Sequence, residues 1–102
     1  MKLYKIMNDN KSCSGGDFYW TDYLPVDVNP GKWTPTLSHI QMCLEGYHGT
    51  SAERLLEFME GGQLFECEAI DLVWDDDSHK FVAKSMRLVR QIDAWNDKTL
   101  RL

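Results

Sequence analysis

The chain has 102 residues, a length that fits one hydrophobic core, so we expect residues 1–102 to form a single compact domain. A hydrophobic content of 43% excludes a disordered chain, and a net charge of −5 argues against direct nucleic-acid binding, which needs a clustered basic surface. No apolar run approaches the roughly 20 residues of a membrane-spanning helix. Residues 1–5 lack the apolar core of a signal peptide, so the sequence predicts a soluble, cytoplasmic protein without a membrane partner.

Short strands are predicted for the first part of the chain. Residues 2–7 alternate polar and apolar side chains, which is the period-two pattern of a β-strand. Residues 18–20 are aromatic and suit a second, short strand. Residues 37–42 fit a helical turn and an extended strand equally well.

Residues 21–38 are predicted to form a long ordered loop. They contain all three prolines of the chain and the turn signal Asn-Pro-Gly at 29–31. We expect the aromatic side chains of Tyr23 and Trp33 to hold this loop against the core.

The segment from Cys43 to Thr50 is predicted to join a strand to one principal helix. Thr50 followed three residues later by Glu53 is typical of a capping box, in which each side chain satisfies a backbone N–H at the helix start. Two glycines at 61–62 end the pattern, because glycine accepts the left-handed conformation after a helix. The helix is therefore predicted over about residues 51–60, and its apolar face consists of Ala52, Leu55, Leu56 and Met59.

A long hairpin is predicted for the C-terminal part of the chain. Alternating residues indicate a strand over 65–74, with a phase change at 71–73 that indicates a β-bulge. Residues 75–79 form the predicted turn, and residues 80–92 form the returning strand. The predicted fold class is α+β: a mainly antiparallel β-sheet with a C-terminal long hairpin and one principal α-helix packed on it.

Charge is distributed unevenly along the chain. Residues 53–77 hold nine acids and one arginine, whereas residues 78–102 hold six basic residues and two acids. One explanation is pairing across neighbouring strands, which contributes about 0.2–1 kcal/mol per pair. The other is an acidic face that attracts a basic partner. On the second explanation, the predicted interface comprises Glu53, Glu57, Glu60, Glu66, Glu68, Asp71 and Trp33.

His48 is the candidate for chemistry in this sequence. It could bind a ligand or act as a general base, with the helix amides after Thr50 holding an anion. Alternatively, His48 fixes a turn through the backbone and Thr50 only caps the helix. Three cysteines and this histidine lack the paired spacing of a zinc site, so we expect no metal, no cofactor and mostly buried, reduced thiols: Cys13, Cys43 and Cys67.

Short motifs over most of the chain resemble a small uncharacterised bacterial and phage domain family that often precedes pentapeptide repeats. The motifs are Tyr4-Lys5, Cys13, Gly15-Gly16, Trp20, Cys43, residues 46–48, residues 64–68, Lys80 and residues 87–90. The resemblance implies a phage or mobile-element protein that works in the host cytoplasm. It further implies binding to a host protein or complex with a basic surface, as an inhibitor of host defence of the anti-CRISPR kind.

A more distant similarity links the chain to ADP-ribosyltransferase-like folds. Leu3-Tyr4, residues 46–50, the predicted helix and Phe65-Glu66 follow the order of that family. The similarity implies an NAD-using enzyme or a degenerate nucleotide-binding relative, with His48 and Glu66 as the catalytic candidates. The early strand departs from the family, since it offers only lysines for the dinucleotide. We therefore predict a protein-binding function without catalytic residues, and keep the enzyme as the alternative.

Overall fold

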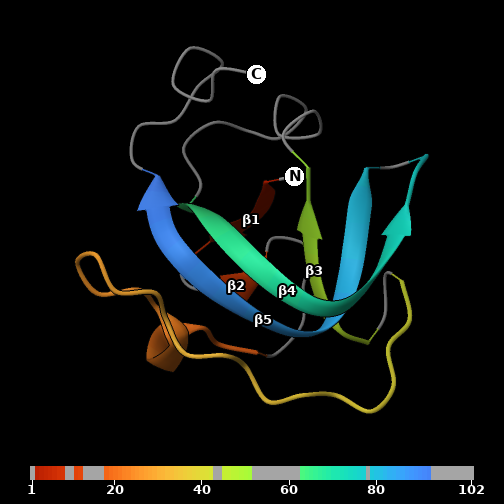
Figure 1. Ribbon diagram of the computed structural model, residues 1–102, viewed down its shortest axis with the longest axis horizontal. Helices are drawn as coiled ribbons and strands as arrows, with labels where there is room; N and C mark the ends of the chain where they lie inside the picture. Colours follow the sequence, from red (N-terminus) through yellow and green to blue (C-terminus); the bar gives the residue numbers. More distant parts are fainter. Residues whose placement is uncertain are drawn as a thin grey trace.

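Five β-strands and one short 3-10 helix make up the described part of the fold (Figure 1). The computed structural model describes residues 2–8, 11–12, 18–42, 45–51, 63–77 and 79–92. The elements are β1 (Leu3–Asn8), β2 (Lys11–Ser12), the 3-10 helix η1 (Thr21–Tyr23), β3 (Tyr47–Thr50), β4 (Gln63–Asp75) and β5 (Lys80–Ile92).

The α+β class predicted from the sequence is wrong. The described residues form mostly antiparallel strand, and η1 is the only helix among them. The principal helix predicted over 51–60 lies outside the described residues, apart from Ser51 directly after β3. Residues 47–50, predicted as the junction between a strand and that helix, form β3 and pair with residues 80–83 of β5. Such long-range pairings make up the described sheet, and a local sequence pattern carries no information on distant partners.

The strand pairings close into a ring. The sheet order is β2-β1-β3-β5-β4, and β1 also pairs with β4. β4 and β5 span 13 residues each and bend strongly, so two parts of β4 meet different neighbours (Figure 1). The inner half of β4, Gln63–Cys67, lies between β1 and β5. The outer half, Leu72–Asp75, pairs with the start of β5, whose other side carries β3.

The predicted C-terminal hairpin is confirmed, but its bulge lies elsewhere. Glu66 pairs with Arg90 while Cys67 pairs with Leu88, so Val89 is the extra residue and the bulge belongs to β5. The register continues unchanged from Ile70 to Trp74, across the residues 71–73 where the bulge was predicted. That stretch contains a different irregularity, because Asp71 adopts a left-handed backbone with φ 53°.

The loop predicted for residues 21–38 is ordered and lies along β5. Backbone N–H groups of Gly31, Thr34 and Leu37 donate to carbonyl oxygens of β5 at 2.7, 2.9 and 2.9 Å. The Tyr47 hydroxyl donates to the Pro35 carbonyl at 2.8 Å and fixes the loop from the side of β3. The loop thereby covers the edge of β5 beyond its contact with β3, which protects that edge from pairing with other chains.

Aromatic side chains join this loop to the core. Phe18, Trp20, Tyr23 and Tyr47 pack with ring centroids 5.1–6.3 Å apart, mostly edge to face. Trp20 is fully buried, and Tyr23 packs against the same cluster, as the sequence predicted, whereas Trp33 is exposed and is not part of this core cluster. Among the described residues, no helix is long and apolar enough to cross a membrane.

Candidate functional site

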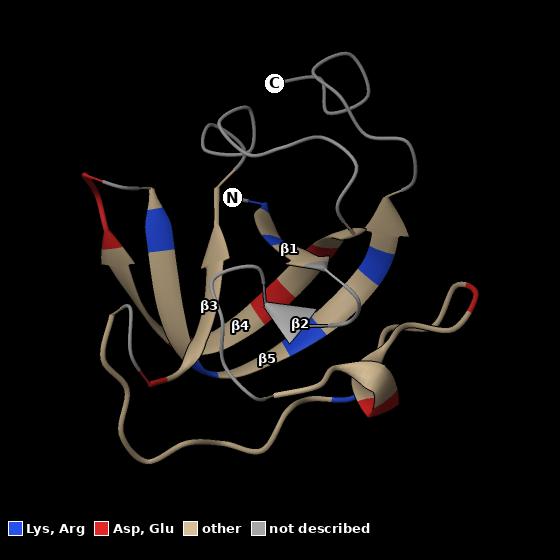
Figure 2. Cartoon of the chain, turned by 180° about the vertical axis from the view of Figure 1, so that it is seen from behind, with Lys and Arg blue, Asp and Glu red and all other residues tan. Residues whose placement is uncertain are grey.

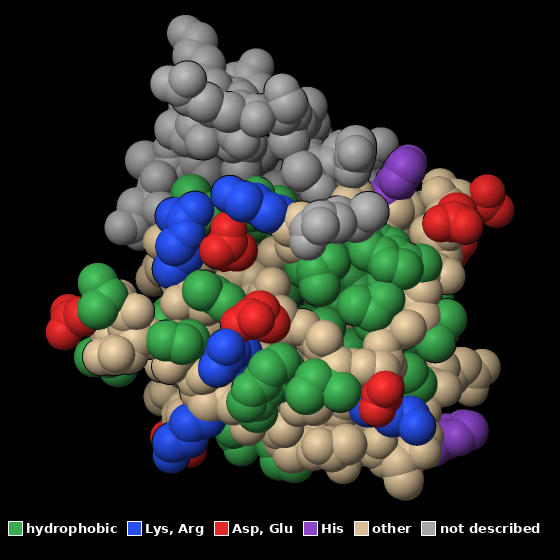
Figure 3. All heavy atoms as spheres, in the orientation of Figure 1, with side chains coloured by type: hydrophobic (Ala, Val, Ile, Leu, Met, Phe, Trp, Pro, Cys, Tyr) green, Lys and Arg blue, Asp and Glu red, His purple; other side chains and the backbone are tan. Residues whose placement is uncertain are grey.

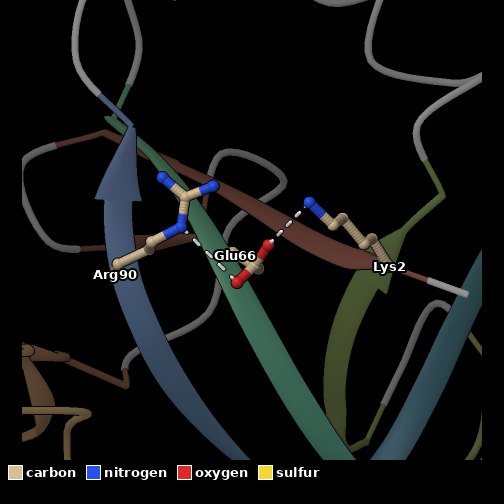
Figure 4. Close-up of polar contacts among 3 residues, drawn as sticks. All are labelled: Lys2, Glu66 and Arg90. Carbon is tan, nitrogen blue, oxygen red and sulfur yellow. Dashed lines mark ion pairs between the residues drawn. The ribbon is translucent and has the colours of Figure 1, made fainter. Parts of the chain in front are cut away.

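Two acids of the predicted interface, Glu66 and Glu68, are engaged in cross-strand ion pairs. The Glu66 carboxylate lies 3.6 Å from the Lys2 ammonium and 3.5 Å from Nε of Arg90, with 20% of the Glu66 side chain exposed (Figure 4). Both Nε and Nη2 of Arg87 lie 2.7 Å from Oε1 of Glu68. Acidic bands on β4 thus face basic bands on β5 (Figure 2). For these two residues, the structure shows the cross-strand pairing that the sequence offered as the first explanation.

Trp33 joins the same network. The Arg87 guanidinium lies over its indole ring, 5.1 Å from the centroid, a cation–π contact. Trp33 and Glu68 therefore meet through one arginine, which ties the long loop to the hairpin. Both residues stay partly exposed, so their predicted interface role stays a prediction.

The remaining predicted interface residues fall into two groups. Asp71 is exposed at the bend of β4, beyond the ion pairs of the inner half. The acids predicted on the helix lie outside the described residues: Glu53, Glu57 and Glu60.

His48 lies in the middle of β3, opposite Val82 of β5. Burial lowers the pKa of its imidazole, and the positive charges of Lys5 and Lys80 lower the pKa further. A backbone hydrogen bond at Gly46 opposes part of this shift. The neutral form is therefore favoured. The Lys5 ammonium donates to the His48 carbonyl oxygen at 2.7 Å and crosses from β1 to β3.

The two alternative catalytic residues are on different strands that flank β1. Tyr4 of β1 pairs with Thr50 of β3 on one side and with Glu66 of β4 on the other. Neighbouring strands lie about 4.8 Å apart, so β1 separates the strand of His48 from the strand of Glu66. The fold therefore does not set the two residues on adjacent strands.

The segment around His48 is explained by packing. Gly46 has φ 127°, a conformation that residues with a side chain rarely adopt. A Cβ atom at Gly49 would lie 2.5 Å from Cζ of Phe81, so only glycine fits beneath that ring. The Thr50 hydroxyl donates to the His79 carbonyl at 3.0 Å and joins β3 to the hairpin turn. The capping partner predicted for Thr50 lies outside the described residues.

An open cleft of about 440 Å³ lies beside β4 at the start of β1. It is lined by Lys2, Leu3, Glu66, Cys67, Glu68, Ala69 and Val89. Burial raises the pKa of the Cys67 thiol to about 12, so this cysteine is a poor nucleophile at neutral pH.

Cys13 and Cys43 lie outside the described residues, and within the described ranges no group of side chains is arranged to hold a metal ion.

A projecting turn, which we call the valine tip (Val26–Asn29), was not recognised from the sequence. Its end residues exchange two backbone hydrogen bonds of 3.0 and 2.9 Å, and Asp27 takes a left-handed backbone with φ 54°. Val26 and Val28 are 66% and 93% exposed. The projection stands out from the body on the left of Figures 1 and 3, with hydrophobic and acidic side chains at its end. The Asn-Pro-Gly signal predicted a turn here, but no periodic pattern shows that valines project from it.

The outer half of β4 is the second surface that sequence reasoning missed. Val73 is 55% exposed, and Ile70 just before the bend is also exposed. The outer half pairs with β5 on one side, and no described strand pairs with its other side. It forms the rim of the molecule on the right of Figure 1.

Comparisons with protein families, curated proteins and solved structures gave no match to this chain. The resemblance to the bacterial and phage domain family and the similarity to ADP-ribosyltransferases therefore stay predictions. Function has to be argued from the surfaces themselves.

Proposed function

We propose that this protein acts by binding another protein, with the valine tip as its anchor. The observation that carries the proposal is the exposure of Val28 at 93% on a turn closed by two backbone hydrogen bonds. Apolar side chains that project from a defined turn can be buried by a partner at little further cost in conformational entropy. Burial of a valine side chain contributes about 1.5–3 kcal/mol.

The turn is held on both sides. On the N-terminal side, the Tyr23 N–H donates to the Trp20 carbonyl at 2.8 Å. On the C-terminal side, Gly31 donates to β5 at 2.7 Å. Pro25 and Pro30 flank the tip and restrict its backbone further. These restraints support a preformed binding element.

The partner surface that fits is an apolar pocket with a basic rim. The pocket would take the two valines, and the rim would face the carboxylate of Asp27 between them. This chemistry agrees with the basic partner surface predicted from the sequence. Inhibition of a host defence complex stays a prediction within this proposal.

The alternative of an NAD-using enzyme gains no support from the strand arrangement. The candidates His48 and Glu66 are on strands that flank β1, and Glu66 is held between two cations. Protein binding therefore remains the function that the geometry supports best.

The test uses a tip variant, Val26→Ser with Val28→Ser, and a control, Tyr19→Ser, which changes an exposed hydrophobic side chain outside the turn. Partners retained by the immobilised wild-type protein at low salt are identified, purified and titrated with all three proteins. We expect the tip variant to bind about ten- to a hundredfold more weakly, and the control to bind like wild type. Equal affinity of the tip variant, or no retained partner at low salt, would reject the proposal.

A further inference from the structure

We infer that the outer half of β4 accepts an extended basic segment of a partner protein as an added strand. This goes beyond the proposed function, because it assigns a second surface on the opposite side of the view from the valine tip (Figure 1). The inference rests on the open sheet edge, the exposed apolar side chains on it and the charge around it.

Among the described residues, this edge of β4 has no paired strand beyond the start of β1. β1 and β4 make their last pair at Leu3 and Cys67, and the cleft beside Lys2 and Leu3 exposes the next β4 residues. From Glu68 to Asp75, no described backbone group pairs with this side of β4. An unpaired edge presents N–H and C=O groups that can bind an incoming strand.

The length of the edge is sufficient for pairing. Leu72–Asp75 offers four residues beyond the left-handed Asp71, and β3 is held to the same part of β5 by four residue pairs. An added strand would extend the order β3-β5-β4 by one position. Val73 and Asp75 share one face by the period-two alternation of a strand. That face would give the partner one apolar and one acidic contact.

Charge favours a basic segment. The carboxylates Asp71, Asp75, Asp76 and Asp77 lie along the edge and its turn, and the neighbouring strand supplies only Lys80 and Lys84 to this region. Lysine or arginine at alternate positions of an incoming strand would therefore meet opposite charge.

The same charges disfavour pairing of this edge with the same edge of a second copy of the chain. Antiparallel self-pairing centred on Val73 would set Asp71 of one copy opposite Asp75 of the other, because both lie two residues from the centre. Like charges directly opposite each other destabilise a strand pair. Acids on an edge thus prevent self-association while they admit a basic strand.

The probe is a capped hexapeptide of alternating lysine and valine, titrated at low salt into the full chain. Two control peptides accompany it: the alternating glutamate–valine peptide, and the lysine–valine peptide N-methylated at alternate amides. We expect the basic peptide to bind and to slow amide hydrogen exchange within Leu72–Asp75. The acidic peptide is expected to bind at least tenfold more weakly, and the methylated peptide to lose binding, since it keeps the charges but cannot form the ladder.

Variants separate this inference from the proposed function. Asp71→Asn combined with Asp76→Asn should weaken the basic peptide on the order of fivefold, and asparagine retains the left-handed backbone at 71. The tip variant should bind the peptide like wild type. Equal binding of the methylated peptide, exchange protection away from Leu72–Asp75, self-association through this edge, or no binding of the basic peptide would each overturn the inference.

Discussion

The inner and outer halves of β4 belong to one strand but differ in their surroundings. The inner half is paired on both sides, and its Phe65 is only 1% exposed. Within the described part of the chain the outer half is paired on one side only, and its Val73 is 55% exposed. Glu66 in the inner half lies between Lys2 and Arg90, while Asp71 lies exposed before the outer half.

This difference shows that the strand paired with the second edge of β4 determines which of its side chains are buried and which are exposed. Where β1 covers β4, an acid becomes part of a cross-strand ion pair and an aromatic residue becomes core. Beyond the residues that β1 covers, Ile70, Asp71 and Val73 are exposed to solvent, while Glu68 is paired only with Arg87 of the neighbouring β5 among the described residues. The following predictions test how sharp that division is.

The largest difference is expected from truncating one apolar residue in each half. Phe65→Ala should lower the free energy of unfolding by about 3–5 kcal/mol, because it leaves a cavity in the closed part of the ring. Val73→Ala should lower it by less than about 1 kcal/mol, since that side chain is already half in water. Urea unfolding of both variants measures the two values. Equal losses would show that the outer half is as tightly packed as the inner half.

The reactivity of the Cys67 thiol tests the boundary between the two halves, because Cys67 is the last residue of β4 that pairs with β1. Burial raises the pKa of its thiol to about 12, so reaction with iodoacetamide at neutral pH should be at least a hundredfold slower in the folded chain than in urea. Mass spectrometry of the digested protein identifies the modified cysteine. Fast modification of Cys67 in the folded protein would show that the sheet opens at this boundary.

The pH dependence of stability tests the burial of His48 on β3. This strand pairs with β5 on the side opposite to the outer half of β4. The pKa of His48 is lowered from the usual 6.5 in the folded chain, so the unfolded chain binds the proton more readily. Stability should therefore fall as pH drops below about 6.5 and level off below the lowered pKa, with no loss above the usual value. Urea midpoints between about pH 5 and pH 8 measure this effect.

The control for the pH series is a second histidine. His48→Gln should flatten the dependence, whereas the exposed His39→Gln should leave it as in wild type. A wild-type protein that becomes more stable on acidification through this range would contradict the burial of His48.

The smallest effect is expected from neutralising one acid in each region. Glu66→Gln should lower the free energy of unfolding by about 0.5–1 kcal/mol at low salt, and less at high salt, because two screened ion pairs are lost. Asp71→Asn should leave stability within about 0.5 kcal/mol of wild type at either salt concentration. A larger loss at Asp71 than at Glu66 would reverse the comparison.

The strands of this protein could be predicted where their pattern is local. Period-two alternation gave β1 and the long hairpin, and the prolines gave the loop along β5. The class assignment failed because a local pattern such as the helix-start signal at Thr50 carries no information on the long-range strand pairings that make up the described sheet. Cross-strand charge pairing could be anticipated from the reversal of sign after residue 77. Which acids are paired depends on register, and the Val89 bulge that sets the register of Glu66 has no local signal.

The sequence by itself determined a folded chain, the first strand and the long hairpin with its turn. Only the tertiary structure decided that β1 covers half of β4 and that a doubly hydrogen-bonded turn projects two valines. The physical reason is that a residue's own pattern sets its strand and its face, whereas the neighbour on the second edge comes from a distant part of the chain. That neighbour determines whether the same side chains are buried in the sheet or exposed to solvent.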